Sequence, residues 1–346
     1  MTSRRGFRLG LACGAVFVAL AFDASAEDTT ALTEKLHRAA ALNSIDDATM
    51  KPWHLKLSFQ LFDDKGTPTE KGTIEEWWAG PSTYKTVYTS PSYTSTEIET
   101  KDGLYRTKGA ERTPRLVEYI LDQVVHPLPR DSDLASALPI FDEHHFGKTK
   151  MDCIMLARPK AGEFSLAHFG IAPIYCFDQG RDSLRLSYAF ISQAALRTRI
   201  GLFQGHEVVV DQTITLTSAT EATAHLDALE SSPASEADLN PSTDLEKIPN
   251  HKGLLSIVTA GSILTSVPPI YPEGARSRRV SGIVVLSAVI GEDGRIHSLK
   301  ALSSPEDDLT HEALTAVQQW TYKPYLVDGM PVEVDTILTV NFEIAH

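Results

Sequence analysis

Long apolar runs are scarce in this 346-residue sequence, and so is positive charge. The only long apolar run lies near the N-terminus at residues 9–22, which excludes a protein with several membrane-spanning helices. Lysine and arginine number 32 against 45 aspartates and glutamates, and the net charge of −13 argues against a nucleic-acid-binding protein. The rest, 42% hydrophobic and 22% charged, is an ordinary globular composition, and the length suggests about two domains.

Motifs of catalysis and metal binding are also missing. The sequence contains no phosphate-binding glycine loop, no G-x-S-x-G and no H-E-x-x-H. Glu75 and Glu76 are adjacent carboxylates that would face opposite sides of a strand, and the adjacent His144 and His145 would likewise point apart. We therefore expect a protein without enzymatic activity, catalytic residues, cofactor or metal.

The first 26 residues have the three parts of a secretory signal peptide. Arg4 and Arg5 form a basic start, residues 9–22 are apolar, and residues 24–26 read Ala-Ser-Ala, a cleavage signal that would leave Glu27 first. An apolar helix of 14 residues spans about 21 Å, less than the ~30 Å of a bilayer core. We expect export to the periplasm, and the paired arginines also resemble a twin-arginine signal. The alternative is a retained inner-membrane anchor.

Cleavage would remove Cys13 and leave two cysteines, Cys153 and Cys176. Two cysteines in an oxidising compartment predict one disulfide bond. The alternative is a reactive thiol or a metal site, although the spacing matches no zinc motif.

A period-two alternation of polar and apolar residues dominates residues 53–217. It is strict at 54–61, as in a half-buried strand, and turn-forming segments such as Asp63-Asp64-Lys65-Gly66 separate such runs. One helix is expected at 114–126, where apolar residues recur at helical spacing after Thr113 and Pro114. The pattern predicts an antiparallel sheet with strands at 54–61, 73–78, 84–89, 93–100, 154–157, 171–177, 184–190, 194–203 and 207–216.

Three stretches outside these strands have other expected structures. Residues 31–42 predict a short amphipathic helix, and residues 130–150 a loop or short helix. Residues 218–252 are rich in Ser, Thr, Ala, Pro, Asp and Glu and predict a flexible acidic linker, with a short helix over 221–229.

The C-terminal part, residues 253–346, predicts short strands and one helix. One or two strands are expected within 253–264, and the others at 283–290, 296–302 and 332–344, with a helix at 309–320. Several motifs occur there in a characteristic order: Pro-Pro-Ile-Tyr-Pro-Glu-Gly-Ala-Arg at 268–276, Asp293-Gly294-Arg295, Trp320-x-Tyr322-x-Pro324, Gly329-x-Pro331-Val332 and Val340-Asn341-Phe342.

Together these motifs closely resemble the TonB C-terminal domain family over about residues 265–346. The resemblance implies a small α+β domain that binds an extended peptide of an outer-membrane receptor by adding it as a strand to an exposed sheet edge. Tyr271 and Pro272 match the family's motif near that edge, and Arg276 belongs to a basic cluster that could attract the partner. The candidate edge is the last strand, and its partner-binding residues are Val334, Thr336, Leu338 and Val340.

Energy-transducing members of that family keep an uncleaved membrane helix and a long proline-rich rod. This sequence has neither in clear form. We therefore expect a non-catalytic periplasmic protein that binds an envelope protein, such as the periplasmic segment of an outer-membrane receptor. The alternative is an anchored energy transducer for receptor-dependent uptake.

Residues 31–217 resemble, in pattern, the half-barrel of LolA-type lipoprotein carriers. The resemblance implies a curved sheet, covered by the helix at 114–126, that holds an apolar or lipid ligand. The protein would then be a lipid or lipoprotein carrier, although the same aromatic residues would also fill an ordinary core. Those aromatic residues are Trp53, Phe59, Trp77, Trp78, Tyr84, Tyr88 and Tyr93.

The expected fold class is therefore α+β, in two domains. A signal peptide at 1–26 precedes an antiparallel half-barrel-like β domain at 27–217 with an inserted helix. The acidic linker at 218–252 then leads to a small TonB-like α+β domain at 253–346.

Overall fold

A computed structural model describes residues 26–110, 112–135, 137–146, 149–157, 173–190, 193–216, 219–232, 239–249, 263–327 and 329–344. The expected signal peptide, except its last residue, and most of the 253–264 stretch lie outside these ranges. No helix within the described ranges is long and apolar enough to cross a membrane.

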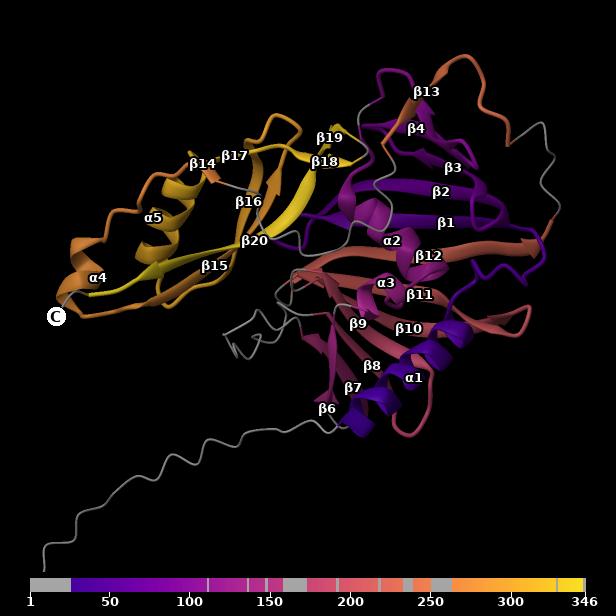
Figure 1. Cartoon of the computed structure of the whole chain (residues 1–346), viewed down its shortest axis with the longest axis horizontal. Helices are drawn as coiled ribbons and strands as arrows, with labels where there is room; N and C mark the ends of the chain where they lie inside the picture. Colours follow the sequence, from indigo (N-terminus) through magenta and orange to yellow (C-terminus); the bar gives the residue numbers. More distant parts are fainter. Residues whose placement is uncertain are drawn as a thin grey trace, which may run out of the picture.

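One antiparallel sheet forms the larger part of the molecule (Figure 1). Within the described ranges it has 13 strands in the order β13-β5-β4-β3-β2-β1-β12-β11-β10-β9-β8-β7-β6, so most strands pair with their neighbour in sequence. The strands are β1 Trp53–Phe62, β2 Pro68–Gly80, β3 Thr83–Thr89, β4 Thr94–Thr100, β5 Gly103–Thr107, β6 Leu138–Phe146, β7 Thr149–Ala157, β8 Ile174–Asp178, β9 Leu184–Phe190, β10 Gln193–Phe203, β11 His206–Leu216, β12 Ala219–Ser231 and β13 Leu245–Ile248.

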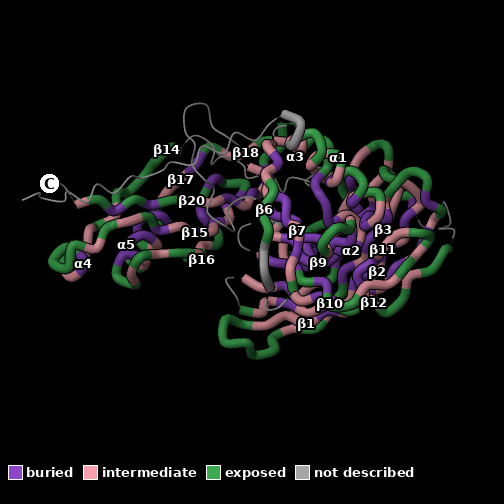
Figure 2. Tube along the Cα trace, turned by 90° about the horizontal axis from the view of Figure 1, so that it is seen from below, coloured by how far each residue is buried: buried purple, intermediate pink, exposed green. Residues whose placement is uncertain are grey.

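In the part of the chain that the structure describes, three helices accompany this sheet: α1 Ala26–Asn43, α2 Arg115–Val125 and α3 Asp131–Leu134. The helix expected at 114–126 is confirmed as α2. Its apolar residues Val117, Ile120 and Val124 are buried and share a core with β1 and β2. Figure 2 shows this buried interior in purple beneath α2.

The stretch predicted to be a linker contributes two strands to the sheet instead. The expected helix at 221–229 is wrong: β12 pairs with β1 on one side and β11 on the other. β13 pairs with β5, and β6 occupies part of the stretch expected to be a loop or short helix. Ala and Glu are good helix formers, but intrinsic propensity is a small term, and pairing on both sides of the strand overrides it.

Most of the aromatic residues on the strands fill the core of this sheet. Trp53 and Trp78 are buried and stack with ring centroids 5.6 Å apart, and Phe59 and Tyr88 belong to the same cluster. Trp77 instead stacks on the His54 ring at 4.7 Å. Trp53, Phe59, Trp78 and Tyr88 therefore fill an ordinary core, which is one of the two roles that the sequence allowed for them.

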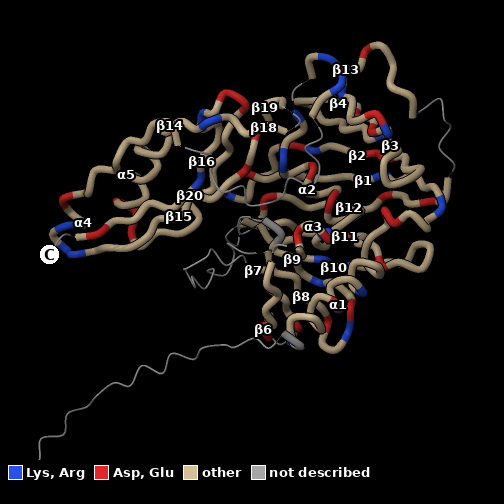
Figure 3. Tube along the Cα trace, viewed as in Figure 1, with Lys and Arg blue, Asp and Glu red and all other residues tan. Residues whose placement is uncertain are grey.

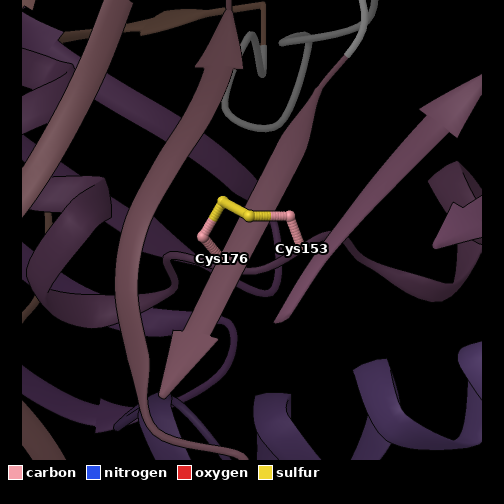
Figure 4. Close-up of a disulfide and its surroundings, with 2 residues drawn as sticks. All are labelled: Cys153 and Cys176. Atoms are coloured by element: carbon pink, nitrogen blue, oxygen red, sulfur yellow. A yellow bond between two sulfur atoms is a disulfide. The ribbon is translucent and has the colours of Figure 1, made fainter. Parts of the chain in front are cut away.

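The predicted disulfide bond is confirmed. Cys153 on β7 and Cys176 on β8 lie opposite each other in register, and their sulfur atoms are 2.06 Å apart (Figure 4). Both cysteines are buried, so the bond cross-links two neighbouring strands within the core.

The C-terminal part forms a separate core around a three-stranded sheet of order β16-β15-β20. Helix α5 packs on this sheet through Leu309, Ala313 and Val317, and Tyr322 is buried beside them. Trp320 is only partly buried, and its indole N–H donates to the Val267 carbonyl at 2.8 Å. The elements are β14 Ile263–Thr265, α4 Glu273–Ser277, β15 Gly282–Ile290, β16 Ile296–Ser303, α5 Asp307–Val317, β17 Thr321–Tyr322, β18 Tyr325–Val327, β19 Met330–Val332 and β20 Val334–Phe342.

Candidate functional site

Strand β20 lies at one edge of the three-stranded sheet. It pairs with β15 along its whole length, from Gly282↔Phe342 to Ile290↔Val334, and with no other strand within the described ranges. An edge strand presents main-chain N–H and C=O groups along its open side, which another chain can pair with. The sheet therefore offers a nine-residue edge at the place that the sequence predicted.

The side chains of β20 alternate between the core and the opposite face. The four partner-binding candidates on this strand have exposed fractions of 5% or less: Val334, Thr336, Leu338 and Val340. Val334, Leu338 and Val340 belong to the core that α5 also contributes to, and Thr336 lies on the same face of the strand. Their side chains cannot meet a partner, so only their main chain lies along the edge. The alternate residues of β20 are less buried and were not among the expected partner-binding residues, although the period of two could have indicated them: Asp335, Ile337, Thr339 and Asn341.

The remaining partner-binding candidates lie at the far end of β20. The Tyr271 ring meets Phe342 edge-on at 5.5 Å, and its hydroxyl donates to the Val280 carbonyl. The Arg276 guanidinium lies 5.5 Å from the Tyr271 ring centre, a cation–π distance. Pro272 is the N-cap residue of α4. The structure thus brings Tyr271, Pro272 and Arg276 together beside the last residue of the edge strand.

A cluster of ion pairs joins the first residues of β20 to the start of α2. Arg112 contacts Glu333 at 3.0 Å, and Arg115 contacts Asp335 at 3.4 Å and Glu118 at 3.2 Å. Figure 3 shows basic and acidic segments meeting where β20 passes the larger sheet. We call these five residues the interdomain cluster, and it fixes the beginning of β20 against the other part of the chain.

The two carboxylates that β20 and its preceding residue bring to the cluster are partly desolvated. Burial raises the pKa of Asp335 above its ordinary value, and the nearby Arg115 and Arg112 oppose the shift. Burial also raises the pKa of Glu333. Between the ordinary and the raised pKa the folded chain therefore binds more protons than the unfolded chain. The stability that this provides is complete below the ordinary pKa and is lost as pH rises through the raised one.

We predict that Asp335→Asn removes the contribution of Asp335 to the loss of stability with rising pH. The free energy of unfolding, measured with urea from pH 3 to 7, should fall with rising pH more steeply in the parent than in the variant. The exposed Asp63 is the control, because hydrogen bonds from Thr67 and Lys65 lower its pKa. For Asp63→Asn, the free energy of unfolding of the parent minus that of the variant should rise with pH, whereas for Asp335→Asn it should fall. If this difference changed with pH in the same direction for both variants, the raised pKa of Asp335 would be contradicted.

A cleft of about 950 Å³ lies between α1, α2 and strands β2 to β4. Its walls include Ser44 after α1, Trp78 and Tyr84 from the strands, Glu118 from α2 and His126 after α2. This is where the sequence pattern placed an apolar ligand, but carboxylates as well as aromatic rings line it. No group of three or more His, Cys, Asp or Glu side chains in the described part of the chain is arranged to hold a metal ion.

A buried polar row crosses four strands beneath this cleft. Glu76, Thr86, Glu97 and Arg106 lie opposite one another in register on β2, β3, β4 and β5. Thr86 donates to Glu76 at 2.7 Å, and Arg106 contacts Glu97 at 2.8 Å. Burial, then the charges of Glu97, Glu118, Glu76 and Asp122, raise the pKa of Tyr88 well above its ordinary value. The sequence alone does not reveal this row, because its members are separated by turns and only strand register aligns them.

The C-terminal part is similar to a known protein family. Residues 267–344 match the family model described as Gram-negative bacterial TonB protein C-terminal. This segment is similar to the TonB C-terminal domain family. A relative named Protein TonB, from Vibrio cholerae, is 30% identical over 83 residues, which are 24% of this chain. The chain spans about a third of the length of that relative, 34%.

A solved TonB domain shows the same likeness. The solution structure of the Pseudomonas aeruginosa TonB C-terminal domain is 29% identical and covers 25% of this chain and 87% of its own, with a TM-score of 0.23. The TonB-like segment thus accounts for about a quarter of the chain, and the large β sheet precedes it.

The larger part has more distant neighbours. A LolA superfamily protein from Nitrosomonas europaea is 7% identical, with a TM-score of 0.42, and covers 61% of this chain and 97% of its own. A lipoprotein-sorting protein domain from Vibrio parahaemolyticus is 7% identical, with a TM-score of 0.39, and covers 62% and 97%. Both names agree with the resemblance of residues 31–217 to LolA-type lipoprotein carriers.

Proposed function

We propose that this chain is a non-catalytic periplasmic protein of the TonB family that binds an envelope partner by strand addition at β20. The observation that carries the proposal is the open edge of β20 in a segment that matches the TonB C-terminal family. The partner would be an extended segment of an outer-membrane receptor or another envelope protein. Binding there would link the protein to transport across the outer membrane.

Strand addition uses the main chain of β20 and suits its buried side chains. An added peptide pairs its N–H and C=O groups with those of β20, which supplies affinity without regard to the strand's own side chains. Specificity would come from the less buried side chains, such as Ile337 and Thr339, and from Tyr271 and Arg276 at the far end. The interdomain cluster would hold the strand still while the partner pairs with it.

We predict that peptides copied from the periplasmic segments of outer-membrane receptors protect β20 amides from hydrogen exchange. The protected amides should be those that alternate along the open side of β20, because only they gain a partner. The matched control is the same peptide N-methylated at every second residue. Two such peptides are possible, methylated at the odd or at the even positions. The peptide whose methyl groups face away from β20 should bind, and the other should not.

The same experiment can contradict the proposal. β16 is the other edge of the sheet, so protection at β16 with none at β20 would place the partner on the wrong edge. Equal binding by both N-methylated peptides would show that main-chain pairing is not the source of affinity.

Two alternatives follow from the same sequence. An anchored energy transducer would keep Met1, whereas a periplasmic protein with a cleaved signal would begin at Glu27, and the intact mass of the exported protein separates the two. A lipid or lipoprotein carrier would use the cleft beneath α2, whose volume of about 950 Å³ favours this second candidate. Lipid that co-purifies with the exported protein would support the carrier.

A further inference from the structure

The larger part of the chain contacts the C-terminal part at both edges of the three-stranded sheet. On the β20 side lies the interdomain cluster, in which Arg115 contacts Asp335 at 3.4 Å. On the β16 side, Lys300 contacts Glu221 of β12 at 3.1 Å and Asp64 at 4.0 Å. The C-terminal part is therefore held at two separate points.

These contacts use the face of the three-stranded sheet that α5 leaves open. The residues of β15 that share a core with α5 are Leu286, Ala288 and Ile290. The alternate residues, Ser287 and Val289, therefore face the other way. Lys300 lies opposite Ser287 in register, and Asp335 lies opposite Val289. Residues opposite each other in register share a face, so the larger part covers one half of this open face.

The contact between the two parts is polar. Among the described residues, each hydrophobic core cluster lies wholly in one part, and none contains residues of both. Ion pairs near the surface are weakened by salt, and contacts between domains without a shared apolar core permit relative motion. The two parts can therefore separate without exposing a common core.

Arg112 and Arg115 each link a carboxylate of one part to a carboxylate of the other. Both contact Glu118 near the start of α2, at 3.5 and 3.2 Å. Arg112 also contacts Glu333, and Arg115 also contacts Asp335. Without the two cations these three carboxylates would repel one another. The closed arrangement therefore depends on the arginines and weakens when their charges are removed or screened.

Arg112 also occupies a main-chain acceptor at the beginning of the edge strand. Its guanidinium donates to the carbonyl of Glu333, the residue before β20, at 3.3 Å. Exposure on the side away from the core rises along the strand, from the half-buried Asp335 to the exposed Thr339. Figure 1 shows β20 running from the larger part toward the free C-terminal end. The covered residues are therefore the first ones of β20.

We propose that the larger part of the chain is a gate on the β20 edge. With the ion pairs formed, the beginning of β20 is covered and a partner can pair only with its far end. With the ion pairs broken, the whole strand becomes available. The purpose of the gate rests on the strand addition proposed above, but its opening is a property of this chain and is measured without a partner.

Double electron–electron resonance on the chain from Glu27 measures the opening. Spin labels at Lys101→Cys in the larger part and Thr315→Cys on α5 occupy exposed positions and report the distance between the parts. We expect a narrow distance distribution in about 20 mM NaCl and a broad one in about 500 mM NaCl, where ion pairs are screened. The same narrow distribution in both solutions would overturn the proposal.

Variants identify the ion pairs that hold the gate closed. Arg112→Gln with Lys300→Gln removes one cation at each edge of the sheet and should give the broad distribution already at low salt. The control is Arg278→Gln, because the Arg278 ion pairs with Glu306 and Asp308 lie within the C-terminal part. It should keep the narrow distribution. A narrow distribution in the double variant, or equal broadening in the control, would also overturn the proposal.

A receptor peptide that protects β20 amides links the gate to binding. Apparent affinity falls with the fraction of closed chains, so the double variant should bind this peptide at least about threefold more tightly than the parent. Equal affinity, in a double variant whose distances have broadened, would overturn the gate and leave strand addition intact. Absence of binding to every chain would contradict strand addition, and the salt-dependent distance would still decide whether the parts open.

Discussion

The Arg106→Met variant should unfold with a free energy about 3–5 kcal/mol lower than that of the parent chain. Arg106 contacts the carboxylate of Glu97 at 2.8 Å, and the Glu97 side chain is fully buried on the sheet. Methionine keeps much of the volume of arginine but leaves a buried charge without its cation. Urea unfolding at pH 7, followed by circular dichroism, measures the loss.

A double variant shows whether the loss of stability comes from the unpaired charge of Glu97. Glu97→Leu with Arg106→Met replaces the pair by apolar groups, and such replacements are often neutral or stabilising. Most of the lost stability should therefore return. A double variant as unstable as Arg106→Met alone would mean that the arginine acts through packing and not through its charge.

Removing the disulfide bond should lower the free energy of unfolding by about 3 kcal/mol. Cys153 and Cys176 are 23 residues apart in sequence, and the bond limits how far the intervening loop can spread when the chain unfolds. The test is Cys153→Ala with Cys176→Ala, compared with the parent by urea unfolding in the absence of reductant.

Reductant provides the internal control for this second prediction. Added dithiothreitol should destabilise the parent by a similar amount and should leave the double alanine variant unchanged. If reductant left the unfolding midpoint of the parent unchanged, the bond would not be stabilising the fold.

Local pattern was sufficient to predict most of the regular elements. The alternation at residues 54–61 became β1, and the apolar spacing after Pro114 became α2, because each pattern matches the face that its element buries. The motifs near 268–276 and 320–324 likewise anticipated a family that the comparison then matched at 267–344. The two remaining cysteines were enough to predict the bond between β7 and β8.

The missed elements are those that depend on pairing with distant strands. β12 joins β1 across more than 150 residues of sequence, and β13 joins β5 across a similar distance. β12 is rich in Ala and Glu, as a helix often is, and β13 is only four residues long within a stretch rich in polar residues. Nothing in the local sequence indicates a partner so far away. The boundary between sheet and linker was misplaced for this reason.

The sequence by itself determined the class of the C-terminal part, the alternation of its last strand and the disulfide, since each rests on short-range spacing or on counting. Only the tertiary structure decided which side chains of β20 are buried, because burial depends on where α5 packs. It also decided that a carboxylate-lined cleft lies beneath α2, with Ser44, Glu99 and His126 in its walls. These residues come from separate elements, and the large sheet brings them together only once its distant strands have paired.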